Sequence, residues 1–196
     1  MAEFFTIDRI LEILGFTVGV IYLYYEYHAD SRMWMASIIM PAISLWIYFR
    51  KGIYADFAIN IYYFVIAVYG YIVWTFNLRK KEKRILPITS IPKRYILPLT
   101  AVGAAVYAVL LAWLLFGTDS NIPYLDALTT ALSIVAMWML ARKYIEQWIV
   151  WIVVDAVCVG LYAYKGIYLY SALYLIYTVI AFFGLAKWRR QMQSGS

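Results

Sequence analysis

One acidic residue, Asp155, lies deep within an apolar stretch of the chain and follows Trp148 and Trp151 at i−7 and i−4. On a helix these spacings place the three side chains on one face. A carboxylate inside such a span costs about 2.5–3.5 kcal/mol on membrane-insertion scales, so it usually serves a function or a packed partner. An acid beside two indoles suits an aromatic cation, because charge pairing is joined by cation–π contact of about 0.5–2 kcal/mol. The alternative is a protonated Asp155 that bonds a neighbouring helix, with both tryptophans in packing.

A second group of candidate binding residues combines an amide with phenols. Asn60 lies about eight residues into another apolar stretch, with Tyr63 and Tyr69 further along it and Asp56 near its outer end, at an expected entrance. Amide and phenol groups can hydrogen-bond the edge of a pyrimidine while the rings stack on it. Tyr177 joins this group as the repeat counterpart of Tyr63. The alternatives are an interhelical hydrogen bond at Asn60 and ordinary packing, because 20 tyrosines cannot all be ligands.

The other residue types argue against catalysis and against a metal site. His28 is the only histidine and Cys158 the only cysteine, so neither a metal cluster nor an intrachain disulfide is expected. No Ser-His-Asp set, Gly-rich phosphate loop or paired nucleophile and base can be assembled. A retinal photoprotein needs a lysine in the middle of a span, whereas the lysines here lie near span ends. We therefore expect neither an enzyme nor a cofactor, and we disfavour a seven-helix receptor or photoprotein.

The elements that position these residues are predicted to be membrane-spanning helices. Of the 196 residues, 65% are hydrophobic and 14% charged, whereas a soluble domain is about half apolar and a quarter charged. Apolar blocks of about 20 residues can each cross the roughly 30 Å hydrocarbon core as a helix. The basic residues fall between these blocks, which favours a membrane surface over a nucleic-acid partner. We predict an all-α integral membrane protein with seven spans, at 8–27, 33–49, 53–77, 95–117, 124–142, 147–164 and 167–187.

The basic residues also orient the predicted spans, because cytoplasmic loops carry an excess of Lys and Arg. With the amino terminus outside and the carboxyl terminus in the cytoplasm, 13 of the 17 basic residues fall inside. The four on the outside are Arg9, Arg50, Lys51 and Lys165. The first residues show no basic segment followed by a short apolar core and a cleavage site, so no cleaved signal peptide is expected.

The chain aligns with itself at an offset of 114 residues. The identities that carry this repeat are Trp34 on Trp148, Trp74 on Trp188, and the run Lys-Gly-Ile-Tyr at 51–54 on 165–168. A three-helix unit reverses sides, so an extra span between two copies makes them parallel, as in the sugar-transporting SWEET proteins. This predicts a 3+1+3 arrangement. Its parts are a first three-helix repeat at 1–77, a basic cytoplasmic loop at 78–94, a linker helix at 95–117, and a second repeat with the cytoplasmic tail at 118–196.

Several of these segments resemble one family. Residues 132–137 (Leu-Ser-Ile-Val-Ala-Met), 142–144 (Arg-Lys-Tyr) and 148–151 (Trp-Ile-Val-Trp) are similar to the nicotinamide riboside transporter family, PnuC, as is 69–74 (Tyr-Gly-Tyr-Ile-Val-Trp). The resemblance implies a seven-helix carrier of the bacterial inner membrane, assembled as a homotrimer. It also implies facilitated diffusion of a vitamin or vitamin precursor, which cytoplasmic phosphorylation then traps.

Two departures from the family pattern concern the substrate. Nicotinamide riboside carriers of this family have an asparagine where this chain has Asp155, and another where it has Ala67. Amides suited to a carboxamide or ribose hydroxyls are thus absent at both places. The resemblance is greater to the thiamine-transporting branch, so thiamine is the expected substrate and nicotinamide riboside, or another nucleoside-like vitamin, the alternative.

Overall fold

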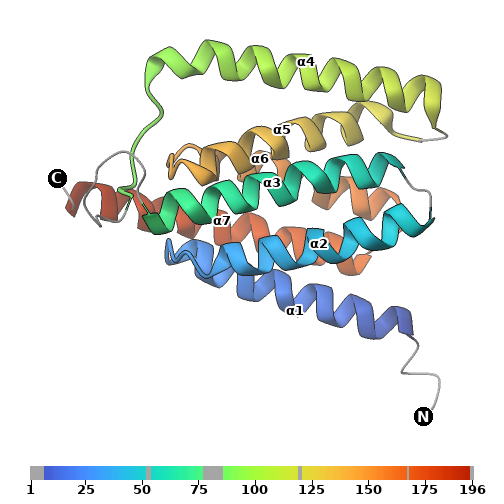
Figure 1. Cartoon of the computed structure of the whole chain (residues 1–196), viewed down its shortest axis with the longest axis horizontal. Coiled ribbons are helices and arrows are strands. Elements are labelled where there is room, and N and C mark those ends of the chain that lie inside the picture. Colours follow the sequence, from blue (N-terminus) through green and yellow to red (C-terminus); the bar gives the residue numbers. More distant parts are fainter. Residues whose placement is uncertain (1–6, 52–53, 77–85, 119–120, 167, 195–196) are drawn as a thin grey trace. The chain divides into compact units, whose positions relative to one another are not determined.

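A computed structural model of the chain describes residues 7–51, 54–76, 86–118, 121–166 and 168–194. Side-chain surroundings are described for most of these residues but not for 7–16, 47, 48, 50, 51, 54–56, 58 and 169. The described residues form seven α-helices (Figure 1), as predicted. Their bounds are α1 Ile7–Tyr27, α2 Met33–Lys51, α3 Tyr54–Phe76, α4 Lys93–Gly117, α5 Pro123–Ala141, α6 Gln147–Tyr164 and α7 Tyr168–Ser194.

Five of these helices are long and apolar enough to cross a membrane. Among the described residues the candidate spans are Ile59–Phe76, Lys93–Gly117, Pro123–Ala141, Gln147–Tyr164 and Tyr170–Ser194, and Met33–Trp46 is a shorter apolar helix. Several spans of this kind in one chain make it a multi-pass membrane protein.

Residues Met1–Ile85 form one compact unit, in which α2 packs against both α1 and α3. At one end of the α2–α3 pair, Trp34 lies edge-on to Trp74, with ring centroids 5.6 Å apart and an interplanar angle of 87°. The Trp34 ring covers α3 at Gly70, where any Cβ atom would collide with it. Because glycine has no side chain, the two helices can approach closely at this point.

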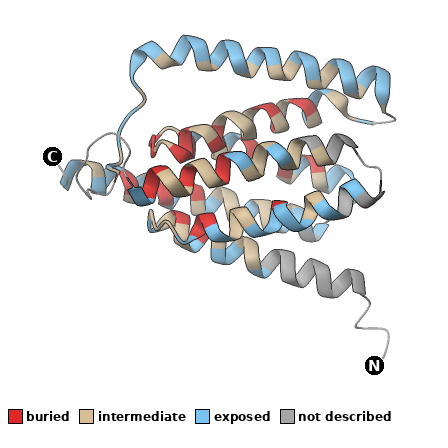
Figure 2. Cartoon of the chain, in the orientation of Figure 1, coloured by how far each residue is buried: buried red, intermediate tan, exposed pale blue. Residues whose placement is uncertain are grey.

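Residues Leu86–Ser196 form the second compact unit, in which α4 packs on α5, α5 on α6 and α6 on α7. Buried residues gather on α5 and α6, whereas α4 has none (Figure 2). Large apolar side chains of α4 are exposed, among them Leu97 at 78% and Phe116 at 90%. An apolar helix with no buried residue is expected where lipid or another membrane-embedded surface surrounds it.

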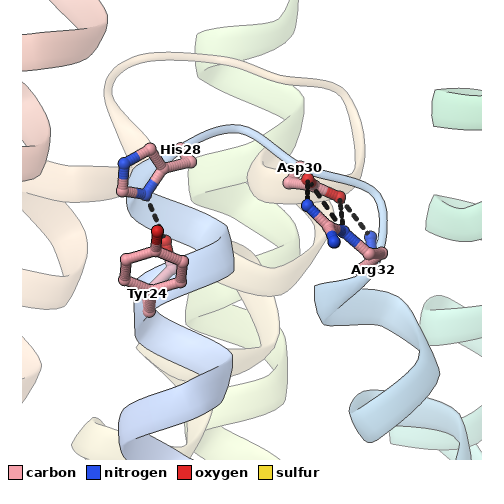
Figure 3. A network of polar contacts seen from close by, with 4 residues as sticks. All are labelled: Tyr24, His28, Asp30 and Arg32. Atoms are coloured by element: carbon pink, nitrogen blue, oxygen red, sulfur yellow. Dashed lines mark hydrogen bonds and ion pairs between the residues drawn. The ribbon is translucent and has the colours of Figure 1, made fainter.

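The turn between α1 and α2 is held by short-range polar contacts (Figure 3). The Arg32 guanidinium donates to both carboxylate oxygens of Asp30, with a shortest distance of 2.7 Å, and this pairing lowers the pKa of Asp30 from its ordinary value. His28 uses its ring Nδ1 to bond the Tyr24 carbonyl oxygen at 2.8 Å. The only histidine of the chain therefore serves the end of α1.

Part of the predicted basic loop is ordered against the turn that joins α5 to α6. The Thr89 backbone N–H donates to the Lys143 carbonyl oxygen at 3.1 Å, and Ile145 N–H donates to the Thr89 carbonyl oxygen at 3.0 Å. The Ile91 N–H adds a 2.9 Å bond to the Glu146 carboxylate. These bonds fix the start of α6, and with it the register of the side chains along that helix.

Candidate functional site

Helix α6 carries three of the candidate residues in the second half of the chain, Trp148, Trp151 and Asp155, whereas Tyr177 lies on α7. Asp155 is 5% exposed, in a helix that is otherwise apolar over its middle turns. Within the described residues the structure gives the Asp155 carboxyl no hydrogen bond and no ion pair. A buried acid with no protein counter-charge is costly, which makes Asp155 the strongest candidate for contact with a charged ligand.

Trp148 lies two turns before Asp155 and packs tightly against α7. Its side chain is 1% exposed, and its ring lies edge-on to Trp188, with centroids 5.5 Å apart at 89°. A Cβ atom added at Gly184 would lie 2.7 Å from the Trp148 ring. In this structure Trp148 therefore joins α6 to α7, and its predicted contact with substrate remains a prediction.

Trp151, one turn before Asp155, is less deeply buried than Trp148, although the indole Nε1 of Trp148 also lacks a hydrogen-bond partner among the described residues. The side chain is partly buried, and its indole Nε1 is shielded from solvent without a hydrogen-bond partner among the described residues. A buried indole N–H usually finds an acceptor. Trp151 thus offers a donor on the α6 face that leads to Asp155.

Tyrosines of α6 and α7 form a cluster near Asp155. Tyr162 stacks on Tyr174, with centroids 5.1 Å apart at 9°, and on Tyr170 at 5.6 Å and 24°. Tyr177 meets Tyr174 edge-on at 5.7 Å. Tyr174 and Tyr177 both lie within electrostatic reach of Asp155. The predicted residue Tyr177 is therefore brought to the acid, together with phenols that could orient an aromatic ring.

Sequence analysis missed Tyr162 and Tyr174, although two signals point to them. Tyr162 follows Asp155 at i+7, which is the same helix face, and Tyr174 is the counterpart of Asn60 at the offset of 114 residues. The first signal is a spacing along one helix, and only the second comes from the repeat alignment. The abundance of tyrosine in the chain concealed them.

Gln147, the first residue of α6, was also missed. Its side chain is 0% exposed, and neither Oε1 nor Nε2 has a hydrogen-bond partner among the described residues. Leaving a buried polar group unsatisfied costs about 1–3 kcal/mol. The missed signal was its spacing. Trp151 follows Gln147 at i+4 and Asp155 follows it at i+8, so the three side chains lie along one helix face.

The other candidate binding residues lie in the first unit, on α3. Asn60, Tyr63 and Tyr69 are partly buried on α3, and Asn60 and Tyr69 already have partners within the structure. Tyr63 lies beside Tyr62, with ring centroids 5.7 Å apart. The side chain of Asp56 lies outside the described residues. Contact of these α3 residues with substrate stays a prediction.

An ion pair joins α5 to the end of α6. Lys165 Nζ donates to Asp126 Oδ1 at 3.2 Å, and both side chains are partly exposed. Exposed ion pairs contribute about 0–1 kcal/mol to stability. This pair therefore helps to hold the end of α6 against the start of α5. Within the described part of the chain, no group of three or more His, Cys, Asp or Glu residues is placed to hold a metal ion.

Comparisons with known proteins agree on one family. Residues 9–190 match the family described as nicotinamide mononucleotide transporter. The nicotinamide riboside transporter PnuC of Escherichia coli is 26% identical over 166 residues, which cover 72% of this chain and 69% of the relative. The transporter of the same name from Neisseria mucosa is 22% identical over 81% of this chain and 62% of its own length. The crystal structure of the vitamin B3 transporter PnuC shares the fold, with a TM-score of 0.67 at 20% identity, over 92% of this chain and 81% of that one.

Proposed function

The chain belongs to the nicotinamide mononucleotide transporter family, and from that premise we propose that it carries a cationic aromatic vitamin precursor, nicotinamide riboside first, across the bacterial inner membrane. Transport is by facilitated diffusion, and phosphorylation of the substrate in the cytoplasm traps it. The similar proteins named as nicotinamide riboside transporters support this substrate over thiamine.

The observation that carries the proposal is the buried carboxyl of Asp155. The pyridinium ring of nicotinamide riboside has a permanent positive charge, which needs a counter-ion when its water is removed. Asp155 supplies a carboxyl without a protein partner among the described residues, and Tyr174 and Tyr177 lie near it. In this proposal Asp155 pairs with the ring charge, while Tyr177 and Trp151 contact the ring.

Thiamine is the second candidate, and Asp155 also favours it. Its thiazolium ring carries the same permanent charge, and the resemblance implies an asparagine at this position in nicotinamide riboside carriers. At the other departure from that pattern, Ala67 is 0% exposed and cannot offer an amide. A thermal-shift screen of the purified protein with nicotinamide riboside, thiamine, riboflavin and deoxynucleosides separates the candidates. Stabilisation by neutral nucleosides alone would contradict a cationic substrate.

The proposed mechanism predicts uptake that stops at equilibrium. The sequence contains no nucleotide-binding motif that would drive a pump. Radiolabelled substrate should therefore enter liposomes containing the protein until the concentrations are equal, regardless of an imposed proton or sodium gradient. Accumulation several-fold above equilibrium, driven by either gradient, would show that the carrier is coupled to an ion.

We also propose the seven-span, 3+1+3 arrangement with parallel three-helix repeats. Its support is the pairing of Trp34 with Trp74 and of Trp148 with Trp188, which have nearly equal distances and angles in the two units. The glycine beneath each first tryptophan also recurs at the offset of 114 residues, at positions 70 and 184. In this arrangement α4 is the linker helix, surrounded by lipid and by the other subunits of a homo-oligomer.

The arrangement predicts that the two ends of α4 lie on opposite sides of the membrane. Ser90 and Asn121 are exposed residues that flank this helix. In a Cys158→Ala background, a membrane-impermeant thiol reagent applied to intact cells should label Asn121→Cys and spare Ser90→Cys until the cells are opened. The reverse pattern would place the amino terminus in the cytoplasm.

A further inference from the structure

The Gln147 side chain has no role in the fold that its contacts explain. Its backbone N–H already bonds the Tyr144 carbonyl oxygen at 3.2 Å. The preceding residue, Glu146, makes the polar contact at this helix start, through the Ile91 N–H. The Gln147 amide is wholly buried, and both of its polar atoms lack partners among the described residues. A methionine would fill the same space without unmet polar atoms.

Gln147 and Trp151 together present an unusual set of unused groups. The amide offers one acceptor and two donors, and the indole offers a further donor. All of these atoms are shielded from solvent. The two residues are one helical turn apart, and Asp155 follows one turn later, about 6 Å further along the axis. The Gln147 amide, the Trp151 indole N–H and the Asp155 carboxyl thus follow one another along one face of α6.

We propose that Gln147 and Trp151 form a subsite for an amide-like edge of the substrate, an NH2 group beside an acceptor. A primary carboxamide on an aromatic ring fits, because two amides can exchange a pair of hydrogen bonds. The ring then points its charged nitrogen toward Asp155, one turn away. This inference rests on the proposed carrier function and adds to it the orientation of the substrate and a residue that selects for its polar edge.

The test compares ligands that differ only at that edge. Wild-type protein should bind nicotinamide riboside about tenfold or more tightly than N-ribosylpyridinium, which lacks the carboxamide. Gln147→Met should lose most of this preference, because only the Trp151 donor of the subsite is left. Since the aminopyrimidine of thiamine presents the same pair of groups, thiamine and oxythiamine form a second pair of ligands. Calorimetric titration gives the four affinities for each protein.

Stability provides a second readout and guards against misfolding. Gln147→Met should unfold at the same temperature as wild type or higher, because it removes buried polar atoms without partners. Gln191→Met, the same change at an exposed position of α7, is the matched control. It should alter neither the unfolding temperature nor the preference between the ligands. A Gln147→Met protein that is destabilised, or that distinguishes the ligands as well as wild type does, overturns the subsite. Wild-type protein that binds neither cation contradicts the proposed function itself.

Discussion

Replacing Asp155 with asparagine is expected to weaken binding of a cationic substrate by about two to three and a half decades in affinity. The substitution keeps the shape of the side chain and its capacity for hydrogen bonding, and it removes the negative charge. Removing one partner of a buried ion pair costs about 3–5 kcal/mol, because the other charge is left without compensation in a medium of low dielectric. The loss should appear in full with thiamine. With nicotinamide riboside it should be smaller, because the resemblance implies an asparagine at this position in carriers of that substrate.

The matched control is Asp30→Asn, the same change in the exposed turn between α1 and α2, where Asp30 pairs with Arg32. It should leave affinity unchanged, because an exposed pair of this kind contributes little. A neutral deoxynucleoside should bind Asp155→Asn as well as wild type, or better. Calorimetric titration of the three proteins decides the matter. Equal binding of the cation by wild type and Asp155→Asn would make Asp155 a structural acid and remove the main support for a cationic substrate.

The helices were predictable because apolar blocks mark membrane spans. α6 has the predicted limits, Gln147 to Tyr164, whereas α7 continues to Ser194, past the predicted end at 187. Hydropathy marks where a chain leaves the bilayer, and Lys and Arg are good helix formers that let α7 continue into water. The bonds from Thr89 to the α5–α6 turn were not predictable. They join backbone groups more than 50 residues apart, and no local pattern encodes them.

The candidate site was predictable only in part, for a physical reason. Asp155 stands out because a charge in an apolar span is costly. Gln147 does not, since an amide at the start of a predicted span is typical of the membrane interface. Its importance comes from complete burial, which depends on the packing around it. Trp148 was predicted to face substrate, and this stays a prediction. Its contact with Gly184 of α7 was not predictable, because the spacing within α6 cannot reveal a neighbouring helix.

That contact gives the second large expected effect, on stability. In Gly184→Ala the new Cβ would lie 2.7 Å from atoms of the Trp148 ring, closer than side chains pack. Either the ring must turn away from Trp188 or α6 and α7 must separate. Overpacking of this kind costs about 1–3 kcal/mol. Gly184→Ala should therefore unfold at a clearly lower temperature in detergent and carry substrate more slowly, because Trp148 and Asp155 share one helix.

The chain offers a matched control and a rescue for this prediction. Gly160 lies on α6 with nothing within 4 Å of an added Cβ, so Gly160→Ala should be neutral or stabilising by up to about 1 kcal/mol. In Gly184→Ala, the further change Trp148→Phe makes room for the methyl group and should restore part of the lost stability. If parallel repeats are correct, Gly70→Ala should behave like Gly184→Ala, since its Cβ would meet Trp34 in the same way. A Gly184→Ala protein as stable as wild type would show that the Trp148 ring can move freely, and then Trp148 would be available to bind substrate.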